Sequence, residues 1–123
     1  MKPKLEQFAN QQVLNLETYR NDGQAMRTPV WFAEDSGVLF LHTVKNSGKV
    51  KRIRRTARVR VAPCAMLGTV KGEWIEGEAR VLDVDGARRV DELLDRRCGA
   101  ANAEFERRNH LRSAAQDAIE IRV

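Results

Sequence analysis

Hydrophobic and polar residues alternate along much of the chain, and this pattern predicts β-strands. From position 13 to position 44, segments rich in β-branched and aromatic residues are separated by turn signals at Asn21-Asp22-Gly23 and at Glu34-Asp35-Ser36-Gly37. Aspartate and glycine tolerate the positive φ angles of tight hairpin turns. We therefore expect three consecutive strands, arranged as an antiparallel meander.

The third of these segments, VLFLHT, is apolar on both faces. One face carries Val38, Phe40, His42 and Val44, and the other carries Leu39, Leu41 and Thr43. A strand with two apolar faces has to be covered on both sides. We expect this cover to be either a barrel interior together with a partner subunit, or a helix.

The second segment, AMRTPVWF, contains a proline in a strand pattern. Arg27, Pro29 and Trp31 share one face, and Met26, Thr28, Val30 and Phe32 share the other. Proline has no N–H to donate to a β-ladder, so Pro29 marks an edge strand or a bulge. Three later segments, RVRVAPCAML, GEWIEGEARVLD and AIEIRV, also alternate and bring the number of expected strands to six.

Helical spacing appears in three places. It predicts a short helix within Leu5–Gln12, a second helix over Gly48–Thr56 after the N-cap candidate Ser47, and a third in GARRVDELLDRRCGA. The apolar residues of the second helix are Val50, Ile53 and Ala57, and those of the third are Val90, Leu93, Leu94 and Cys98, with Gly99 as its end. We expect part of the stretch up to Gln116 to be helical as well.

These elements predict a mainly β fold in a single domain over residues 1–123. Six strands with a few short helices are typical of a small antiparallel barrel with helical additions. A chain of 123 residues is long enough for one hydrophobic core and too short for two comfortable domains.

The positive charge of the chain is concentrated in one stretch. Seven of the 22 Lys and Arg residues lie between Lys49 and Arg60, where there is no acidic residue; the remainder of the chain has 22 − 7 = 15 basic residues against 17 acidic ones. The net charge of +5 therefore resides in this stretch. Such a local excess implies a local anionic partner: a nucleic acid, a membrane surface or a small phosphorylated ligand.

Three interpretations of the basic stretch remain open at this point. It could be a solvated helix face whose arginine stems cover apolar surface. Nucleic acid binding is disfavoured, because no aromatic residues are interleaved for base stacking and the rest of the chain is slightly acidic. The third interpretation is a compact phosphate site, in which Ser47, Gly48 and Lys49 present helix N–H groups and a charge, and Lys51, Arg52 and Arg55 form a cationic rim.

Other chemistry-bearing residues are isolated in the sequence. Cys64 and Cys98 are 34 positions apart with no His or Cys at metal-ligand spacing, so we expect two buried thiols and no metal site. His42 and His110 belong to no catalytic grouping, and the chain has neither a Rossmann fingerprint nor a P-loop. With no secretory signal and no apolar run long enough for a bilayer, we expect a cytoplasmic protein without membrane association.

The order of these segments resembles a known family. The succession DGQAMRTPVWF, VLFLHT, SGKVKRIRR, RVRVAPC and EWIEGEARVL, from Val13 to Asp83, resembles the split β-barrel flavin-binding proteins related to pyridoxamine phosphate oxidase. More narrowly, it is similar to their branch of F420-dependent oxidoreductases. The sequence departs from the pattern at Thr56-Ala57, where the family usually has Asn-Pro, and from Cys98 to Gln116, which matches no pattern and leaves the substrate open.

The resemblance implies where a cofactor binds. Its phosphate would be held by Arg27, Ser47 and Lys49 with the hydroxyl of Thr43, and Gly48 would allow a close approach. Its flat ring would lie against the strand backbone at Thr28, Pro29, Val30 and Trp31. His42, beside Thr43, is either at the border of this ring or a partly buried structural histidine. Lys51 and Arg52 would remain in the cationic rim described above.

The resemblance also implies an activity and partners. We expect an oxidoreductase that uses the deazaflavin coenzyme F420, whose phosphodiester and polyglutamate tail suit a long cationic rim, to transfer a hydride to or from an unidentified small molecule. FMN is the alternative cofactor, and a non-catalytic cofactor carrier is the alternative role. A homodimer with the cofactor sites at its interface is implied, and no catalytic side chain can be named from the sequence.

Overall fold

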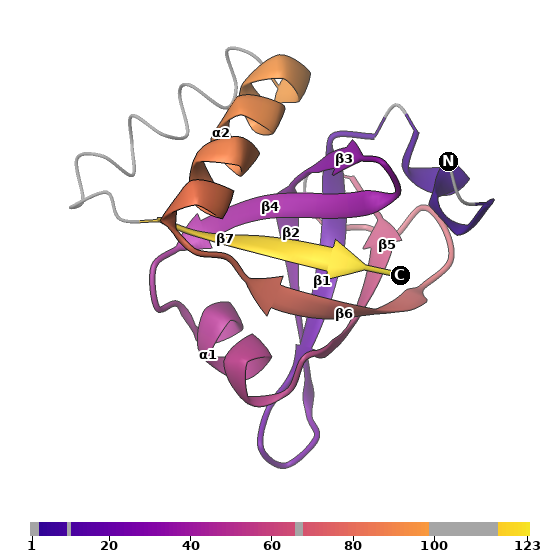
Figure 1. Cartoon of the computed structure of the whole chain (residues 1–123). Helices are drawn as coiled ribbons and strands as arrows, with labels where there is room; N and C mark the ends of the chain where they lie inside the picture. Colours follow the sequence, from indigo (N-terminus) through magenta and orange to yellow (C-terminus); the bar gives the residue numbers. More distant parts are fainter. Residues whose placement is uncertain (1–2, 10, 66–67, 99–115) are drawn as a thin grey trace.

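One antiparallel sheet of seven strands curls into a barrel and forms most of the molecule (Figure 1). The computed structural model describes residues 3–9, 11–65, 68–98 and 116–123. In chain order the elements are the 3-10 helix η1 (Pro3–Phe8), β1 (Val13–Tyr19), β2 (Ala25–Trp31), β3 (Ala33–Asp35), β4 (Val38–Val44), α1 (Gly48–Arg55), β5 (Arg58–Pro63), β6 (Ile75–Val81), α2 (Val84–Cys98) and β7 (Gln116–Arg122).

The strand order shows why the barrel is split. The strands follow one another in the sheet as β2-β1-β5-β6-β7-β4-β3, so β2 and β3 lie at its two ends. In the chain, however, only Phe32 separates β2 from β3. The sheet must therefore curl until its two ends meet, yet no β-ladder joins β2 to β3 or β4 among the described residues. This open seam between β2 and β4 is called the split below.

The expectation of six strands is wrong by one, and the physical reason lies in a turn. Ser36 (φ 54°) and Gly37 (φ 83°) both adopt positive φ, which allows a two-residue hairpin turn. The turn expected over 34–37 therefore contracts, and β3 pairs with β4 from Ala33↔Phe40 to Asp35↔Val38. The expected meander is confirmed for the β1–β2 hairpin, but its second half is wrong: among the described residues β2 has no ladder with β4, which pairs with β3 and β7.

The alternating residues fill the barrel as expected. Side chains that point inward and are almost fully buried come from every long strand except β2, and from η1 and α1: Leu5, Phe8, Leu14, Leu16, Leu39, Leu41, Val50, Ile53, Val59, Val61, Ala79, Ile119 and Ile121. The outward positions of β5 and β6 carry charged residues that face one another across the strands, as in the pairs Arg58↔Glu78 and Arg60↔Glu76. The mainly β class predicted from the sequence is confirmed.

The two-sided apolar strand is covered by a helix. On the outer face of the sheet, Phe40 of β4 and Ala118 of β7 form a second buried cluster with Val90 and Leu94 of α2. Of the two covers expected for β4, the structure thus shows the helix. The helix α2 begins at Val84, slightly earlier than expected, because the side chain of Asp83 accepts a hydrogen bond from the N–H of Gly86 (2.9 Å).

The other two helices lie where the sequence predicted them, but they end earlier than predicted. The first one is a 3-10 helix that ends at Phe8, well before Gln12. Leu5 and Phe8 are buried, and Ala9 is exposed. α1 ends at Arg55, because Thr56 adopts an extended conformation, so Ala57 lies beyond the helix and is exposed. The expectations for residues 99–115, His110 and the side chain of Cys98 lie outside the described residues.

Two further observations limit the chemistry. Within the described ranges, no three His, Cys, Asp or Glu side chains gather as a metal site would require, and no helix is both long and apolar enough to cross a membrane. Cys64 is a buried free thiol, as expected, and burial raises its pKa.

Candidate functional site

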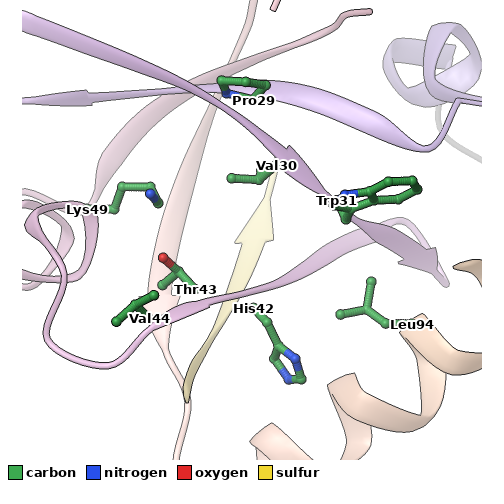
Figure 2. Close-up of a pocket in the computed structure, with 8 residues that line it drawn as sticks. All are labelled: Pro29, Val30, Trp31, His42, Thr43, Val44, Lys49 and Leu94. Carbon is green, nitrogen blue, oxygen red and sulfur yellow. The ribbon is translucent and has the colours of Figure 1, made fainter. Parts of the chain in front are cut away.

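A pocket of about 200 Å³ opens in the split between β2 and β4 (Figure 2). Its lining comes from β2, from β4, from the first turn of α1 and from α2: Pro29, Val30, Trp31, His42, Thr43, Val44, Lys49 and Leu94. Five of the eight residues, Pro29, Val30, Trp31, Val44 and Leu94, have aliphatic or aromatic side chains. Lys49 is the only lysine, arginine or acidic residue among the eight. The pocket is therefore an apolar slot with one cationic end.

The free edge of β2 offers backbone groups to the split. The N–H of Phe32 donates to the carbonyl of Gln12, and the N–H of Arg20 donates to the carbonyl of Gln24. The even-numbered residues of β2 therefore direct their backbone N–H and C=O groups toward β1. The odd-numbered residues, which include Pro29 and Trp31, consequently direct their backbone groups away from β1. Pro29 lacks an N–H at a position where no described strand pairs with this edge, and β2 is an end strand of the sheet, as predicted.

The turn before α1 is hydrogen-bonded to β7 and leaves the helix N-terminus without a side-chain cap. Asn46 adopts a positive φ of 56°, and its N–H donates to the carboxylate of Asp117 (2.9 Å). Ser47 occupies the N-cap position, as predicted, but its side chain makes no capping hydrogen bond; its Oγ lies 3.3 Å from Oγ1 of Thr43. The first N–H groups of α1 therefore keep their hydrogen-bonding capacity for another partner.

Lys49 extends from this turn into the pocket. Its side chain is half-buried, and it forms no ion pair with any carboxylate of the described residues. Burial lowers the pKa of the Lys49 ammonium group, and the positive charge of Arg52 lowers it further. A partly desolvated cation of this kind costs free energy, and an anion bound beside it and beside the helix N-terminus would offset that cost.

A second groove, of about 430 Å³, lies on another side of α1. It is lined by Arg20, Asn21, Asp22, Gly48, Lys51, Arg52 and Arg55, so four cations face one acid. Burial lowers the pKa of Arg52, and the charges of Arg20 and Arg55 add to this effect. We refer to this surface as the cationic groove.

Gly48 and Thr18 fix the position of the Arg52 guanidinium in the cationic groove. The Nε of Arg52 donates a hydrogen bond to Oγ1 of Thr18 (2.7 Å). A Cβ at Gly48 would lie 2.8 Å from Nη1 of Arg52, so only glycine allows the guanidinium to fold back over the first turn of α1. The cation thus lies close to the same helix N-terminus that Lys49 flanks.

Arg27, predicted as a phosphate ligand, is engaged elsewhere. Its Nε donates to Glu17 (2.8 Å), and its guanidinium stacks over the ring of Trp74 at 4.8 Å. Glu17 is 1% exposed and also accepts hydrogen bonds from Arg60 (2.7 Å) and Tyr19 (2.6 Å). Chiefly because of Arg60, the pKa of Glu17 falls to about 2. The structure therefore places Arg27 in an ion-pair cluster, not among the pocket-lining residues.

His42 supports the pocket from behind. Its imidazole points away from the other lining residues and toward α2 (Figure 2), where Nε2 lies 3.4 Å from the carbonyl oxygen of Ala87 and Nδ1 lies 3.3 Å from Asp91. These contacts connect β4 to α2. With these contacts, His42 is better suited to position α2 than to border a cofactor ring.

The structure brings together most of the predicted site residues. Six line the pocket: Pro29, Val30, Trp31, His42, Thr43 and Lys49. Gly48, Lys51 and Arg52 line the cationic groove, and Ser47 contacts Thr43. Arg27 and Thr28 line neither, since Thr28 pairs with Leu16 on the face that points into the barrel.

Sequence reasoning missed several lining residues. Val44 and Leu94 in the pocket, and Arg20, Asn21 and Asp22 in the cationic groove, were not among the predicted site residues. Leu94 could be recognised as apolar in an amphipathic helix, but nothing local shows that this helix reaches the pocket. Arg20 sits at a hairpin turn, and its proximity to α1 follows only from the curl of the sheet.

Comparisons with known proteins support the fold. No protein-family model and no curated protein matches the chain. Among solved structures, HutZ, the heme storage protein from Vibrio cholerae, superposes with a TM-score of 0.70 at 12% identity, over 98% of this chain and 88% of HutZ. A Listeria innocua protein named after pyridoxamine 5'-phosphate oxidase gives 0.64 at 18% identity, over 96% and 88%. An F420 reductase gives 0.59 at 21%, over 96% and 90%.

The chain therefore has the split β-barrel fold of proteins related to pyridoxamine phosphate oxidase, as the resemblance implied. The proteins with this fold carry names as different as heme storage protein and F420 reductase. At identities of 12% to 21%, the likeness defines the architecture and leaves the activity to be argued from the site.

Proposed function

We propose that this protein is an oxidoreductase that uses coenzyme F420 to reduce or oxidise a small organic molecule. The observation that carries the proposal is Lys49, a half-buried cation without a carboxylate partner among the described residues, which stands between an uncapped helix N-terminus and an apolar slot. This arrangement suits a molecule with an anionic group at one end and a flat ring at the other.

The residues present fit such a cofactor. The ammonium group of Lys49 and the first N–H groups of α1 would hold a phosphate, with the hydroxyls of Ser47 and Thr43 beside it. The apolar slot lined by Val30 and Trp31 would shield a ring from water. When bound, F420 supplies two-electron hydride chemistry, which needs no acid pair or nucleophile from the protein.

The cationic groove favours F420 over FMN. FMN ends in one phosphate, which Lys49 and the helix N-terminus would already satisfy. F420 continues into a chain of carboxylates, and the four cations of the groove would bind these beyond the phosphate. One protein of the same fold is an F420 reductase, which supports the same choice.

FMN remains the second candidate, with the same slot and the same phosphate position. It is favoured by the similarity to the Listeria innocua protein named after pyridoxamine 5'-phosphate oxidase. A non-catalytic carrier of either cofactor would also use these residues. Turnover with an acceptor, and not binding alone, separates the enzyme from the carrier.

We further propose a homodimer with the site at its interface. The outer face of β4 no longer supports this, because α2 covers it. The remaining support is the mouth of the pocket, where Val44 is 53% exposed and Pro29 is also exposed. Sedimentation velocity should show a mass of two chains; a monomer at micromolar concentration that still binds cofactor would reject this part of the proposal.

A side-by-side titration with F420, FMN and duplex DNA tests the proposal. We expect saturable binding of F420, weaker binding of FMN and none of DNA at physiological salt. Lys49→Ala should weaken F420 binding more than about tenfold, since it removes a charge-assisted contact to the anion. Lys45→Ala, which removes an exposed lysine four positions earlier, is the matched control and should change binding less than about twofold.

A further inference from the structure

The end of the pocket away from Lys49 is apolar. Trp31 of β2 and Leu94 of α2 stand at this end, and Lys49 stands at the other (Figure 2). No side chain with a formal charge lies at the Trp31 end among the described lining residues, and the ring of His42 is directed toward α2. A charged or strongly polar group placed at this end would lose its hydration without a compensating partner.

Leu94 is held firmly in this position. Its side chain is 2% exposed and belongs to the buried cluster with Phe40, Val90 and Ala118, against which Trp31 also packs. The helix itself is connected to β4 through the contacts of His42 with Ala87 and Asp91. Close packing of this kind leaves Leu94 little freedom to move aside for a larger ligand.

We infer that Leu94 is a specificity-determining residue: it closes the apolar end of the pocket and restricts the bound molecule there to a neutral, planar group of limited size. This inference rests on the proposed function in taking the pocket as the place where the flat ring or its reaction partner binds. It adds a residue from α2, far from β2, β4 and α1 in the sequence, to the recognition of the ligand.

The test uses Trp31 as an internal reporter. The chain has two tryptophans, and Trp74 lies outside the pocket, stacked by Arg27, so Trp74→Phe leaves Trp31 as the only indole. In that background, two neutral planar quenchers without phosphate are titrated: menadione, with two rings, and 9,10-phenanthrenequinone, with three. We expect saturable quenching by menadione and about tenfold weaker binding of the three-ring probe, because a wall discriminates sharply by size.

Leu94→Ala should reduce this difference between the probes at least about fivefold, because it removes the wall. Leu93→Ala is the matched control: this leucine is the neighbour on the same helix, packs on the same cluster and does not line the pocket. It should leave the ratio of affinities unchanged within about twofold. Equal ratios in the two variants, or quenching by menadione that never saturates, would overturn the inference.

Leu94→Val provides a second measurement if Leu94→Ala does not fold, which thermal melting reveals. It removes a single methylene and should shift the ratio in the same direction by a smaller amount, about twofold. No shift in a folded Leu94→Val protein would contradict the inference. Because the probes carry no phosphate, they report on Leu94 even if F420 and FMN fail to bind; conversely, cofactor binding with no effect of Leu94 would reject this inference alone.

Discussion

Two charged side chains that are at least partly buried, Glu17 and Lys49, differ in whether the fold provides an opposite charge. Glu17 is almost fully buried and accepts hydrogen bonds from Arg27, Arg60 and Tyr19, so its charge is compensated within the fold. Lys49 is half-buried and has no carboxylate partner in the described part of the chain. The first arrangement stabilises the protein; the second costs stability and suits ligand binding.

Glu17→Gln should therefore destabilise the fold. The folded-state pKa of about 2 lies below the ordinary 4.5, so the carboxylate contributes stability that is fully present above pH 4.5 and is lost as the pH falls toward 2. The contribution is on the order of 3 kcal/mol at neutral pH. Urea unfolding at pH 7 and at pH 3 measures it: the difference between wild type and variant should shrink at the lower pH.

Glu76→Gln is the control for this prediction. Glu76 is exposed on β6, and its substitution should change the free energy of unfolding by less than about 0.5 kcal/mol at either pH. An effect of Glu76→Gln as large as that of Glu17→Gln would contradict the assignment of the stabilising charge to Glu17.

At the scale of elements, α1 connects the two binding surfaces. Its first turn carries Lys49 on the side of the pocket and Gly48 on the side of the cationic groove. Val50 and Ile53 anchor the helix in the barrel core, so its N-terminus is fixed relative to both. A ligand whose phosphate binds at this turn could extend its ring into the pocket and its tail into the groove.

Gly48→Ala should weaken the binding of F420 while leaving the stability of the fold nearly unchanged. The new Cβ would displace the guanidinium of Arg52, whose flexible side chain can move at little cost, so the melting temperature should change by less than about 2 °C. Affinity for F420 should fall about threefold to tenfold, because a cation leaves the groove. Isothermal titration calorimetry with F420 and with its form lacking the glutamates provides the comparison, and equal losses for both forms would contradict a role of Arg52 in holding the tail.

At the scale of the whole molecule, the curl of the sheet creates the site. The ends of the sheet meet without a ladder, and the pocket lies in that split. The same curl brings the turn after β1, with Arg20, beside α1. Residues from four elements can thus line one slot, although no two of these elements are paired strands.

If the cationic groove binds the carboxylates of F420, the affinity for F420 should depend on salt concentration. Replacing Arg20 and Arg55 by Ala should weaken F420 binding and flatten the dependence of its affinity on salt concentration, because fewer cations meet the carboxylates. Binding of FMN, which has no such tail, should change less than about twofold. Titrations between low and high ionic strength test this, and an equal effect on both cofactors would argue against a tail in the groove.

The sequence was most informative where local physics decides the structure. The alternation of Val59 and Val61 with arginines, the proline at position 29 and the serine before α1 predicted a strand, an edge and a helix start that the structure contains. The sequence was least informative about which side chains contact one another across the sheet. Nothing near Arg27 shows that the strand register places it opposite Glu17, ten residues earlier, and so binds it in an ion-pair cluster.

The sequence by itself determined the β class, the position of the basic helix and the residues of its first turn, because periodicity, caps and turn chemistry act over a few neighbouring positions. Only the tertiary structure decided that β2 and β4 remain unpaired, that α2 covers β4 and brings Leu94 to the pocket, and that Arg20 joins the groove. These contacts depend on how far the sheet curls, and the curl is set by the packing of the entire core.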